Sequence, residues 1–407
     1  MKKYKFAAVL MACLMTAALV FATTVRAEGD DDLPTIESVQ IYKCLVMKKG
    51  VTVPGVTFSY TLAPGQAVEG TENTLAVFAG PEGAVFASTH SSTASVSFSP
   101  SDTVTAEASA PDGSTIQFAT SDEAYAEKPL TVDLTGVTFT EAGIYRYVVT
   151  ETQSDIAGIV PDSVNKRYLD VLVQKSAQGN DYVPTAVVLK TNDGVPDTEG
   201  QSDTGAKSTG FTNRYNTNSV GFAKSVAGNQ ASFNQYFKFT VKLTGGQTVD
   251  DATRVKVSGV FDAKPAENMA TQYDAAEMAQ ANDGVEYVTL SQLRAGKDFF
   301  LKDGQLVMLT GIPDGMGYEV TEVPEDYTPS VQVTGDSECT PADSKVTDSS
   351  LSQDTTLSFV NTRNGIIPST GVSAAFALPA AVMLAGIAGV VLIFVRRMKK
   401  KAERETN

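Results

Sequence analysis

The chain has 407 residues and a formal net charge of −15, with 32 basic and 47 acidic residues. An acidic surface repels phosphate backbones, so no nucleic acid is expected as a partner. The chain contains one histidine, His90, and no tryptophan. A Ser-His-Asp triad or a multi-histidine metal site would depend on that single imidazole, so common hydrolase chemistry is disfavoured. We therefore expect a protein that is not an enzyme and holds no metal or other cofactor.

The N-terminus has the pattern of a secretory signal peptide. Lys2, Lys3 and Lys5 precede an apolar run over residues 6–22, and Ala27 ends a short segment suited to cleavage. The sequence predicts a leader over residues 1–27 and a mature chain that begins at Glu28. The mature protein should therefore be secreted.

The C-terminus carries an apolar run of residues 372–395 that contains no charged side chain. Such a run can cross a bilayer as a helix, which needs about 20 residues. Basic residues follow from Arg396 and should keep that end in the cytoplasm. Directly before the run stands the pentapeptide Ile367-Pro368-Ser369-Thr370-Gly371. One interpretation of this C-terminal segment is an ordinary membrane anchor, in which the pentapeptide is part of a juxtamembrane loop.

Between these ends the pattern is typical of an all-β protein. Short runs rich in β-branched and aromatic residues alternate with turn residues, at spacings typical of antiparallel sandwiches. They include 56–60, 143–150, 168–174, 236–243 and 306–309. Only residues 265–282, rich in Ala, Met, Glu and Gln, have a helical composition. We expect two tandem β-sandwich domains, over residues 28–216 and 217–362, followed by a C-terminal segment over residues 363–407.

The two halves repeat one arrangement of polar residues. Each has a lysine in its first strand, a glutamate in a late strand and an asparagine in its last strand. The first set is Lys43, Glu151 and Asn213, and the second set is Lys224, Glu322 and Asn361. Side chains two positions apart share a face of a strand, and by that test all six lie on the apolar face. Glu319 fails the test, because it alternates with Tyr318 and Val320.

Burial of these groups would give them a chemistry of their own. An apolar core lowers the pKa of a lysine and raises that of a glutamate, so both can become neutral. A neutral amine is a nucleophile, and a protonated glutamate could hydrogen-bond to the amide oxygen of the asparagine and shuttle protons. The product would be a Lys–Asn isopeptide bond with loss of ammonia. The alternative is a buried ion pair capped by an amide.

Two resemblances give these features a context. The pentapeptide, span and basic tail resemble the cell-wall sorting signal of Gram-positive surface proteins, in which sortase cuts between residues matching Thr370 and Gly371. Ile367 stands where that family most often has Leu. Both halves resemble the Ig-like (CnaB-type), isopeptide-forming domains of sortase-assembled backbone pilins of the FctA-like, T-antigen type. That resemblance implies the bonds Lys43–Asn213 and Lys224–Asn361, with Glu151 and Glu322 as their catalytic carboxylates.

The same resemblance implies a polymer at the cell surface. A precursor held in the membrane by residues 372–395 would be cut by sortase, and Thr370 would join a lysine of a neighbouring copy or the peptidoglycan. Lys207, six residues before Asn213, is the first candidate for that lysine, and Lys190 is the second. The alternatives are a monomeric wall-anchored adhesin or a pilus base or tip subunit, with a host ligand that the sequence does not identify.

Overall fold

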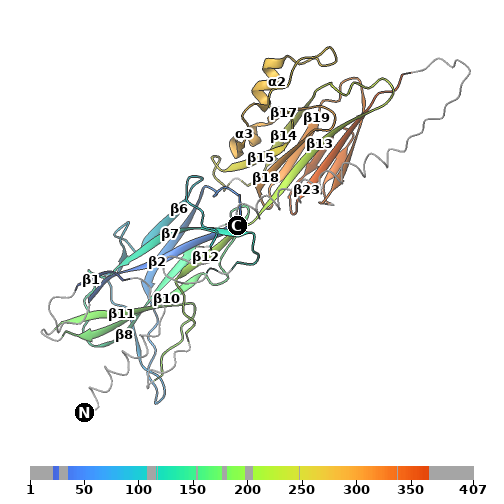
Figure 1. Cartoon of the computed structure of the whole chain (residues 1–407). Helices are drawn as coiled ribbons and strands as arrows, with labels where there is room; N and C mark the ends of the chain where they lie inside the picture. The colour runs from blue at the N-terminus through green and yellow to red at the C-terminus, as the bar shows by residue number, and fades with distance from the viewer. Residues whose placement is uncertain are drawn as a thin grey trace, which may run out of the picture.

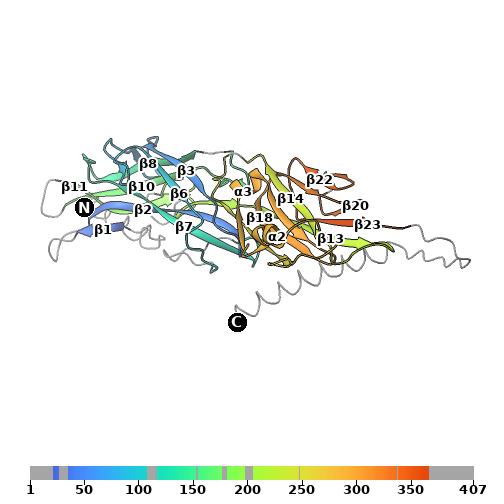
Figure 2. The same cartoon turned by 90° about the horizontal axis from the view of Figure 1, so that it is seen from above.

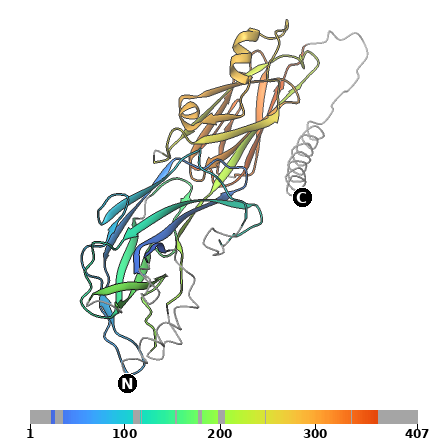
Figure 3. The ribbon, with the colours of Figure 1, turned by 60° about the vertical axis from the view of Figure 1, so that its left-hand side comes forward.

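The computed structural model describes residues 22–26, 35–107, 116, 118–152, 155–176, 181–197, 205–246, 248–336 and 338–365. The described chain is mostly β-structure, which confirms the all-β fold class expected from the sequence. Its strands form four sheets, two from the chain before Asn216 and two from the chain after it. The two pairs of sheets lie end to end, so the molecule is elongated (Figure 1). The same arrangement is visible in the other two views (Figure 2, Figure 3).

The first pair of sheets contains the strands before Asn216. The first sheet has the order β5-β7-β2-β12-β9, with β1 paired to β2. Its strands are β1 (Ala22–Arg26), β2 (Thr35–Lys48), β5 (Val85–Phe86), β7 (Glu123–Asp133), β9 (Ile159–Val160) and β12 (Gly210–Tyr215). The second sheet has the order β11-β10-β8-β3-β6, with β4 paired to β8. Its strands are β3 (Val56–Pro64), β4 (Val77–Ala79), β6 (Thr93–Phe98), β8 (Gly143–Thr152), β10 (Lys166–Lys175) and β11 (Tyr182–Lys190).

The second pair follows the same plan with different loops. The third sheet has the order β16-β15-β18-β13-β23-β20, and the fourth has the order β17-β14-β19-β22-β21. The strands of the third sheet are β13 (Thr217–Ala227), β15 (Arg254–Val260), β16 (Tyr287–Thr289), β18 (Leu306–Pro313), β20 (Thr328–Thr334) and β23 (Thr355–Thr362). Those of the fourth are β14 (Phe237–Thr244), β17 (Lys297–Leu301), β19 (Gly317–Glu322), β21 (Thr340–Ala342) and β22 (Lys345–Asp348).

Alternation along the strands builds the core between each pair of sheets. In β3 every second residue from Val56 to Leu62 is buried, and β23 alternates in the same way. Aromatic side chains meet across the gap, with the ring of Tyr60 on β3 lying 5.4 Å from that of Phe211 on β12. In the second pair, Phe222 on β13 and Phe239 on β14 are also 5.4 Å apart. Each pair of sheets therefore encloses its own layer of apolar side chains.

The helical prediction is correct only in part. Of residues 265–282, the helix α2 occupies only Ala275–Asn282, because the side chain of Asp274 caps its first turn by accepting from the Glu277 amide. A second helix, α3 (Leu290–Ala295), was not expected from the sequence. It begins with a capping box between Thr289 and Gln292. This sequence signal is short, and the residues around it resemble a strand.

A short junction joins the two pairs of sheets. Only Asn216 separates β12 from β13. Beside this junction Gly55 donates its N–H to Thr253 Oγ1 at 2.9 Å and accepts the Asp250 N–H at 3.1 Å. A Cβ atom at Gly55 would lie 2.5 Å from the Cβ of Asp250, so this approach requires glycine. The second half is thus held against the first by backbone contacts as well as by the chain.

Five residues of the predicted leader are part of this fold. Ala22–Arg26 form β1, which pairs antiparallel with the beginning of β2. The rest of the predicted leader lies outside the described residues, as does the predicted sorting signal from Ile367 to Gly371 with the span that follows it. Within the described residues, no helix is long and apolar enough to cross a membrane.

Candidate functional site

The lysine and the asparagine of the first set lie on neighbouring strands. β2 and β12 run parallel, with Lys43 opposite Phe211 and Leu45 opposite Asn213. The asparagine is therefore displaced from the lysine by two positions and shares its face of the sheet. Gly210 begins β12, and a Cβ there would lie 1.8 Å from the carbonyl oxygen of Tyr42. Glycine thus permits the close approach of the two strands at this point.

The second set repeats this register. β13 and β23 also run parallel, with Lys224 opposite Phe359 and Val226 opposite Asn361. In both halves the lysine lies opposite a phenylalanine, and the asparagine comes two residues after that phenylalanine. This common diagonal places an amine and a carboxamide side by side on the buried face.

The two glutamates enter from the facing sheets. Glu151 on β8 lies opposite Tyr60 of β3, and Glu322 on β19 lies opposite Phe239 of β14. Both residues are 2% exposed. Glu319, three residues before Glu322, instead forms a partly exposed ion pair with Lys345. The strand-parity argument therefore separated the buried glutamate from the surface one.

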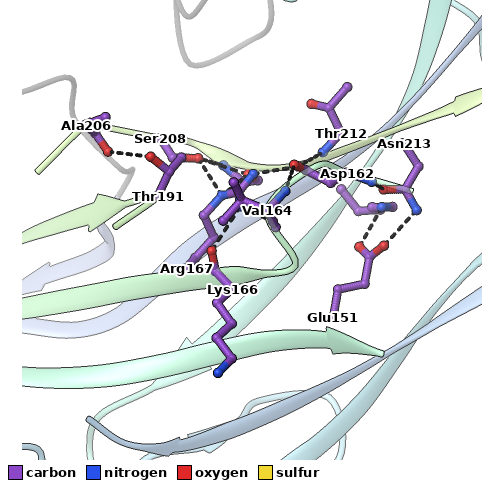
Figure 4. Close-up of polar contacts among 12 residues, drawn as sticks. Glu151, Asp162, Val164, Lys166, Arg167, Thr191, Ala206, Ser208, Thr212 and Asn213 are labelled. Atoms are coloured by element: carbon purple, nitrogen blue, oxygen red, sulfur yellow. Dashed lines mark hydrogen bonds and ion pairs between the residues drawn. The ribbon is translucent and has the colours of Figure 1, made fainter. Parts of the chain in front are cut away.

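The first triad is completely buried and closely spaced. Lys43 Nζ donates to Glu151 Oε2 at 2.6 Å, and Asn213 Nδ2 donates to Glu151 Oε1 at 2.7 Å. Lys43 and Asn213 are each 1% exposed. The carboxylate therefore bridges the amine and the carboxamide, and Figure 4 shows Glu151 facing Asn213.

The second triad has the same bridging carboxylate. Lys224 Nζ lies 2.6 Å from Glu322 Oε1 as an ion pair, without the angle of a hydrogen bond. Asn361 Nδ2 donates to the same oxygen at 3.0 Å. Lys224 is 1% exposed and Asn361 is fully buried. The structure thus brings together all six residues singled out from the sequence, in two sets of three.

Burial shifts the pKa values of Lys43, Lys224 and Glu322 in the direction that the chemistry needs. Desolvation lowers the pKa of Lys43 to about 8, partly opposed by Glu151. It lowers the pKa of Lys224 to about 8 as well, partly opposed by Glu322. The pKa of Glu322 is raised by the same desolvation. Each amine lies over an aromatic ring, that of Phe58 at 4.2 Å in the first site and that of Phe237 at 4.4 Å in the second.

One geometric expectation differs from the structure. We expected the glutamate to hydrogen-bond to the oxygen of the carboxamide, but in both sites it accepts from the nitrogen. In the first site the reason is a competing donor, since the backbone N–H of Asp162 lies 2.8 Å from Asn213 Oδ1. The glutamate is therefore placed to take a proton from the amine and to deliver it to the amide nitrogen, which would leave as ammonia.

The sequence argument missed two groups of the first site. The hydroxyl of Tyr60 donates to Glu151 Oε2 at 2.8 Å, and strand parity in 56–60 could have predicted its inward direction. Asp162 had no such signal, because it contacts Asn213 through its backbone. In the second site Phe239 occupies the position of Tyr60 and has no hydroxyl. There Glu322 Oε2 and Asn361 Oδ1 have no hydrogen-bond partner among the described residues.

The two candidate acceptor lysines differ sharply in exposure. Lys207 is exposed, whereas Lys190 is completely buried. Lys190 Nζ lies 2.5 Å from Asp170 Oδ2 and donates to the carbonyl of Gly194 at 2.7 Å. Arg146 donates to both oxygens of the same Asp170 carboxylate, at 2.6 and 2.8 Å. Lys190 is thus part of a buried ionic cluster and is not presented to another molecule.

Replacing Asp170 by Ala is expected to destabilise the first pair of sheets by about 3–5 kcal/mol, because two buried cations would lose their shared carboxylate. Urea unfolding followed by circular dichroism measures this loss. The matched control is Lys238→Ala, which removes a more exposed ion pair with Asp298 and should cost less than about 1 kcal/mol. Equal effects of the two substitutions would show that the buried cluster contributes no more than a surface pair.

No group of three or more His, Cys, Asp or Glu side chains that could hold a metal ion occurs within the described ranges.

Comparison with known proteins relates this geometry to one group of proteins. A family model described as a domain of unknown function, DUF7601, matches residues 218–363. A protein named Pilin from Streptococcus pyogenes serotype M1 is 25% identical over 272 residues, which is 65% of this chain and 70% of that protein.

Solved structures give the same relationship at the level of the fold. The crystal structure of the major pilin from Streptococcus pyogenes has a TM-score of 0.51 and 20% identity, covering 81% of this chain and 99% of that one. The major pilin protein T-13 from the same species has a TM-score of 0.51 and 23% identity, covering 81% and 98%. The resemblance to Gram-positive pilins is therefore confirmed: this chain is similar in sequence to a pilin of a Gram-positive bacterium and in fold to the major pilins of that species.

Proposed function

We propose that this chain is the structural backbone subunit of a sortase-polymerised pilus, with each half locked by an isopeptide bond that it forms itself. The observation that carries the proposal is the pair of buried triads, which repeat the same register on neighbouring parallel strands. The bonds would be Lys43–Asn213, with Glu151 as proton shuttle, and Lys224–Asn361, with Glu322 in that role. The similarity to streptococcal pilins supports the same role.

The proposed precursor has four parts. Residues 1–27 are the leader, 28–216 and 217–362 are two tandem Ig-like (CnaB-type) sandwich domains, and 363–407 are the sorting segment. Sortase would cut between Thr370 and Gly371, while residues 372–395 hold the precursor in the membrane. Thr370 would then be joined to another copy or, at the base of the polymer, to peptidoglycan. The mature protein is accordingly proposed to act at the cell wall and cell surface as a structural protein.

Lys207 is the proposed acceptor in the neighbouring copy. Its side chain is exposed, as attack on a sortase-bound Thr carbonyl requires. Its backbone is nevertheless held in place, because the flanking Ala206 carbonyl accepts from Thr191 N at 2.8 Å. On the other side, Ser208 N donates to the Leu189 carbonyl at 2.9 Å. A fixed backbone with an exposed amine suits a nucleophile that must enter another protein's active site.

Immunoblots of cell-wall extracts test the polymer directly. A backbone subunit should give a ladder of bands that resists SDS, because its copies are joined by amide bonds. A monomeric wall-anchored adhesin, the alternative function, should give a single band broadened by attached peptidoglycan. The single band in cells that contain the cognate sortase would overturn the proposal.

The rate of bond formation at the second site should depend on pH as a bell-shaped curve. Attack needs a neutral Lys224 amine and departure of ammonia needs a proton on Glu322, so the reactive pair shares one proton. Above about pH 8, the lowered pKa of Lys224, that proton is lost. In acid a second proton binds to the pair and the reaction slows. Because the pKa of Glu322 is raised, this slowing begins at a higher pH than it would for an ordinary carboxyl. Mass spectrometry of newly made protein measures the rate, and a rate that rises continuously into alkali would contradict a shared proton.

A further inference from the structure

The loop between β9 and β10 contacts the asparagine side chain of the first site and the backbone of its glutamate. Asp162 in this loop donates its backbone N–H to Asn213 Oδ1 at 2.8 Å. Three residues later, the Asn165 carbonyl accepts the backbone N–H of Glu151 at 2.8 Å. The loop is therefore tied both to the strand of the glutamate and to the side chain of the asparagine. Figure 4 shows Asp162 beside Asn213.

The side chain of Asp162 fixes the direction of its own backbone N–H. Its Oδ2 accepts from Thr212 N at 2.9 Å, so the carboxylate grips the residue next to Asn213. Its Oδ1 accepts from Val164 N at 3.0 Å, which closes the turn. Arg167, which is 4% exposed, donates to Oδ2 at 2.6 Å and so fixes the position of the carboxylate. Asp162 thus clamps β12 at two successive residues, with its side chain on one and its N–H on the other.

Attack by the Lys43 amine would place negative charge on the atom that this N–H touches. The Nζ–Cγ bond forms while the Cγ–Oδ1 double bond opens, so Oδ1 of Asn213 becomes an oxyanion. Glu151 takes the proton from Nζ and gives it to Nδ2, the Cγ–Nδ2 bond breaks, and ammonia leaves as the carbonyl re-forms. A donor already 2.8 Å from that oxygen stabilises the transition state without having to move.

We propose that the backbone N–H of Asp162 is the oxyanion donor for the first cross-link, and that Asp162 and Arg167 position it through their side chains. The inference rests on the proposed isopeptide chemistry and adds to it a group that the second site does not share. There, the corresponding oxygen, Asn361 Oδ1, has no hydrogen-bond partner in the part of the chain that the structure describes. The first bond should therefore form faster than the second in the same molecule.

A backbone ester tests the donor without altering any side chain. Cell-free synthesis of residues 28–370 with the α-hydroxy analogue of aspartate at position 162 replaces this N–H by oxygen. After translation is stopped, quenched samples are digested and the cross-linked peptides of each site are quantified over time. The ester should slow the first cross-link by about 100-fold, the effect of losing one oxyanion donor. The second cross-link, in the same molecule, should keep its rate.

The matched control is an ester at Ile159, just before this loop, whose N–H donates to the Ile156 carbonyl at 3.0 Å rather than to Asn213 or Asp162. It should leave the first cross-link close to its normal rate, so a loss at position 162 is not a general weakening of the loop. Equal rates for the two esters would overturn the role of the Asp162 N–H. Absence of both cross-links from the unmodified chain would instead overturn the proposed function, and this inference with it.

Discussion

Replacing Glu151 by Ala should leave the first cross-link unformed, so that the intact mass of the mature region, after allowance for the substitution itself, is one ammonia higher than that of the doubly cross-linked chain. Glu151 is the one carboxylate that contacts both Lys43 and Asn213 in the described structure, so without it no group carries the proton from the attacking amine to the amide nitrogen. Glu322→Ala should do the same at the second site, and the double variant should retain both ammonia equivalents. Intact-mass spectrometry of the recombinant protein measures each change.

The same variants should lose stability as well as the bond. Each cross-link closes a loop of more than a hundred residues, which stabilises a domain by roughly 5 kcal/mol in the chain-entropy model. Thermal unfolding should therefore occur at a lower temperature in each single variant. Glu319→Ala is the matched control, because Glu319 lies on the same strand as Glu322 but pairs with Lys345 at the surface. A natural protein with the mass of the uncrosslinked sequence would refute the cross-links.

Replacing Lys207 by Arg should abolish the SDS-resistant ladder in wall extracts. The guanidinium keeps the positive charge and much of the length of the side chain, but it stays protonated and does not act as a nucleophile. The monomer should still fold, form both internal bonds and reach the cell wall, because Lys207 lies in neither triad. Immunoblots of wall extracts and the intact mass of the monomer measure these outcomes together.

Lys166→Arg is the matched control for the acceptor. Lys166 is also exposed, and it begins β10 in the same half of the molecule. Its replacement should leave the ladder intact. A ladder that persists in Lys207→Arg would exclude this lysine, and Lys190 would be a poor substitute because its amine is buried against Asp170.

The order of polar residues repeated in the two halves, together with strand periodicity, was sufficient to predict the members of the two triads. The predicted runs 143–150 and 236–243 correspond to β8 and β14, with differences of one or two residues at their ends. Because side chains alternate between faces, locating a strand also decided which of its polar residues point inward. This is why Glu322 was separated from Glu319 before any contact was known.

The remaining parts of the site depend on contacts that no periodicity encodes. Asp162 lies in a turn and acts through its backbone, so its residue type gave no indication that it faces Asn213. Lys190 was the second candidate for the acceptor, and its local sequence does not show its burial, because its partner Asp170 comes from another strand. The helix α2 was predicted too long, because composition alone did not show that Asp274 ends the preceding turn and caps the first turn of the helix.

The proposed bonds between neighbouring parallel strands would also determine how a fibre of this protein responds to a sudden pull. From Lys43 the covalent route passes to Asn213, through the single-residue junction at Asn216 to Lys224, and across to Asn361. With both bonds in place, the roughly 300 residues inside the two closed loops, on the order of 100 nm of extended chain, cannot be drawn out. Such a fibre would have little capacity to absorb a shock by lengthening. It would be nearly inextensible and would transmit the full load to its anchor.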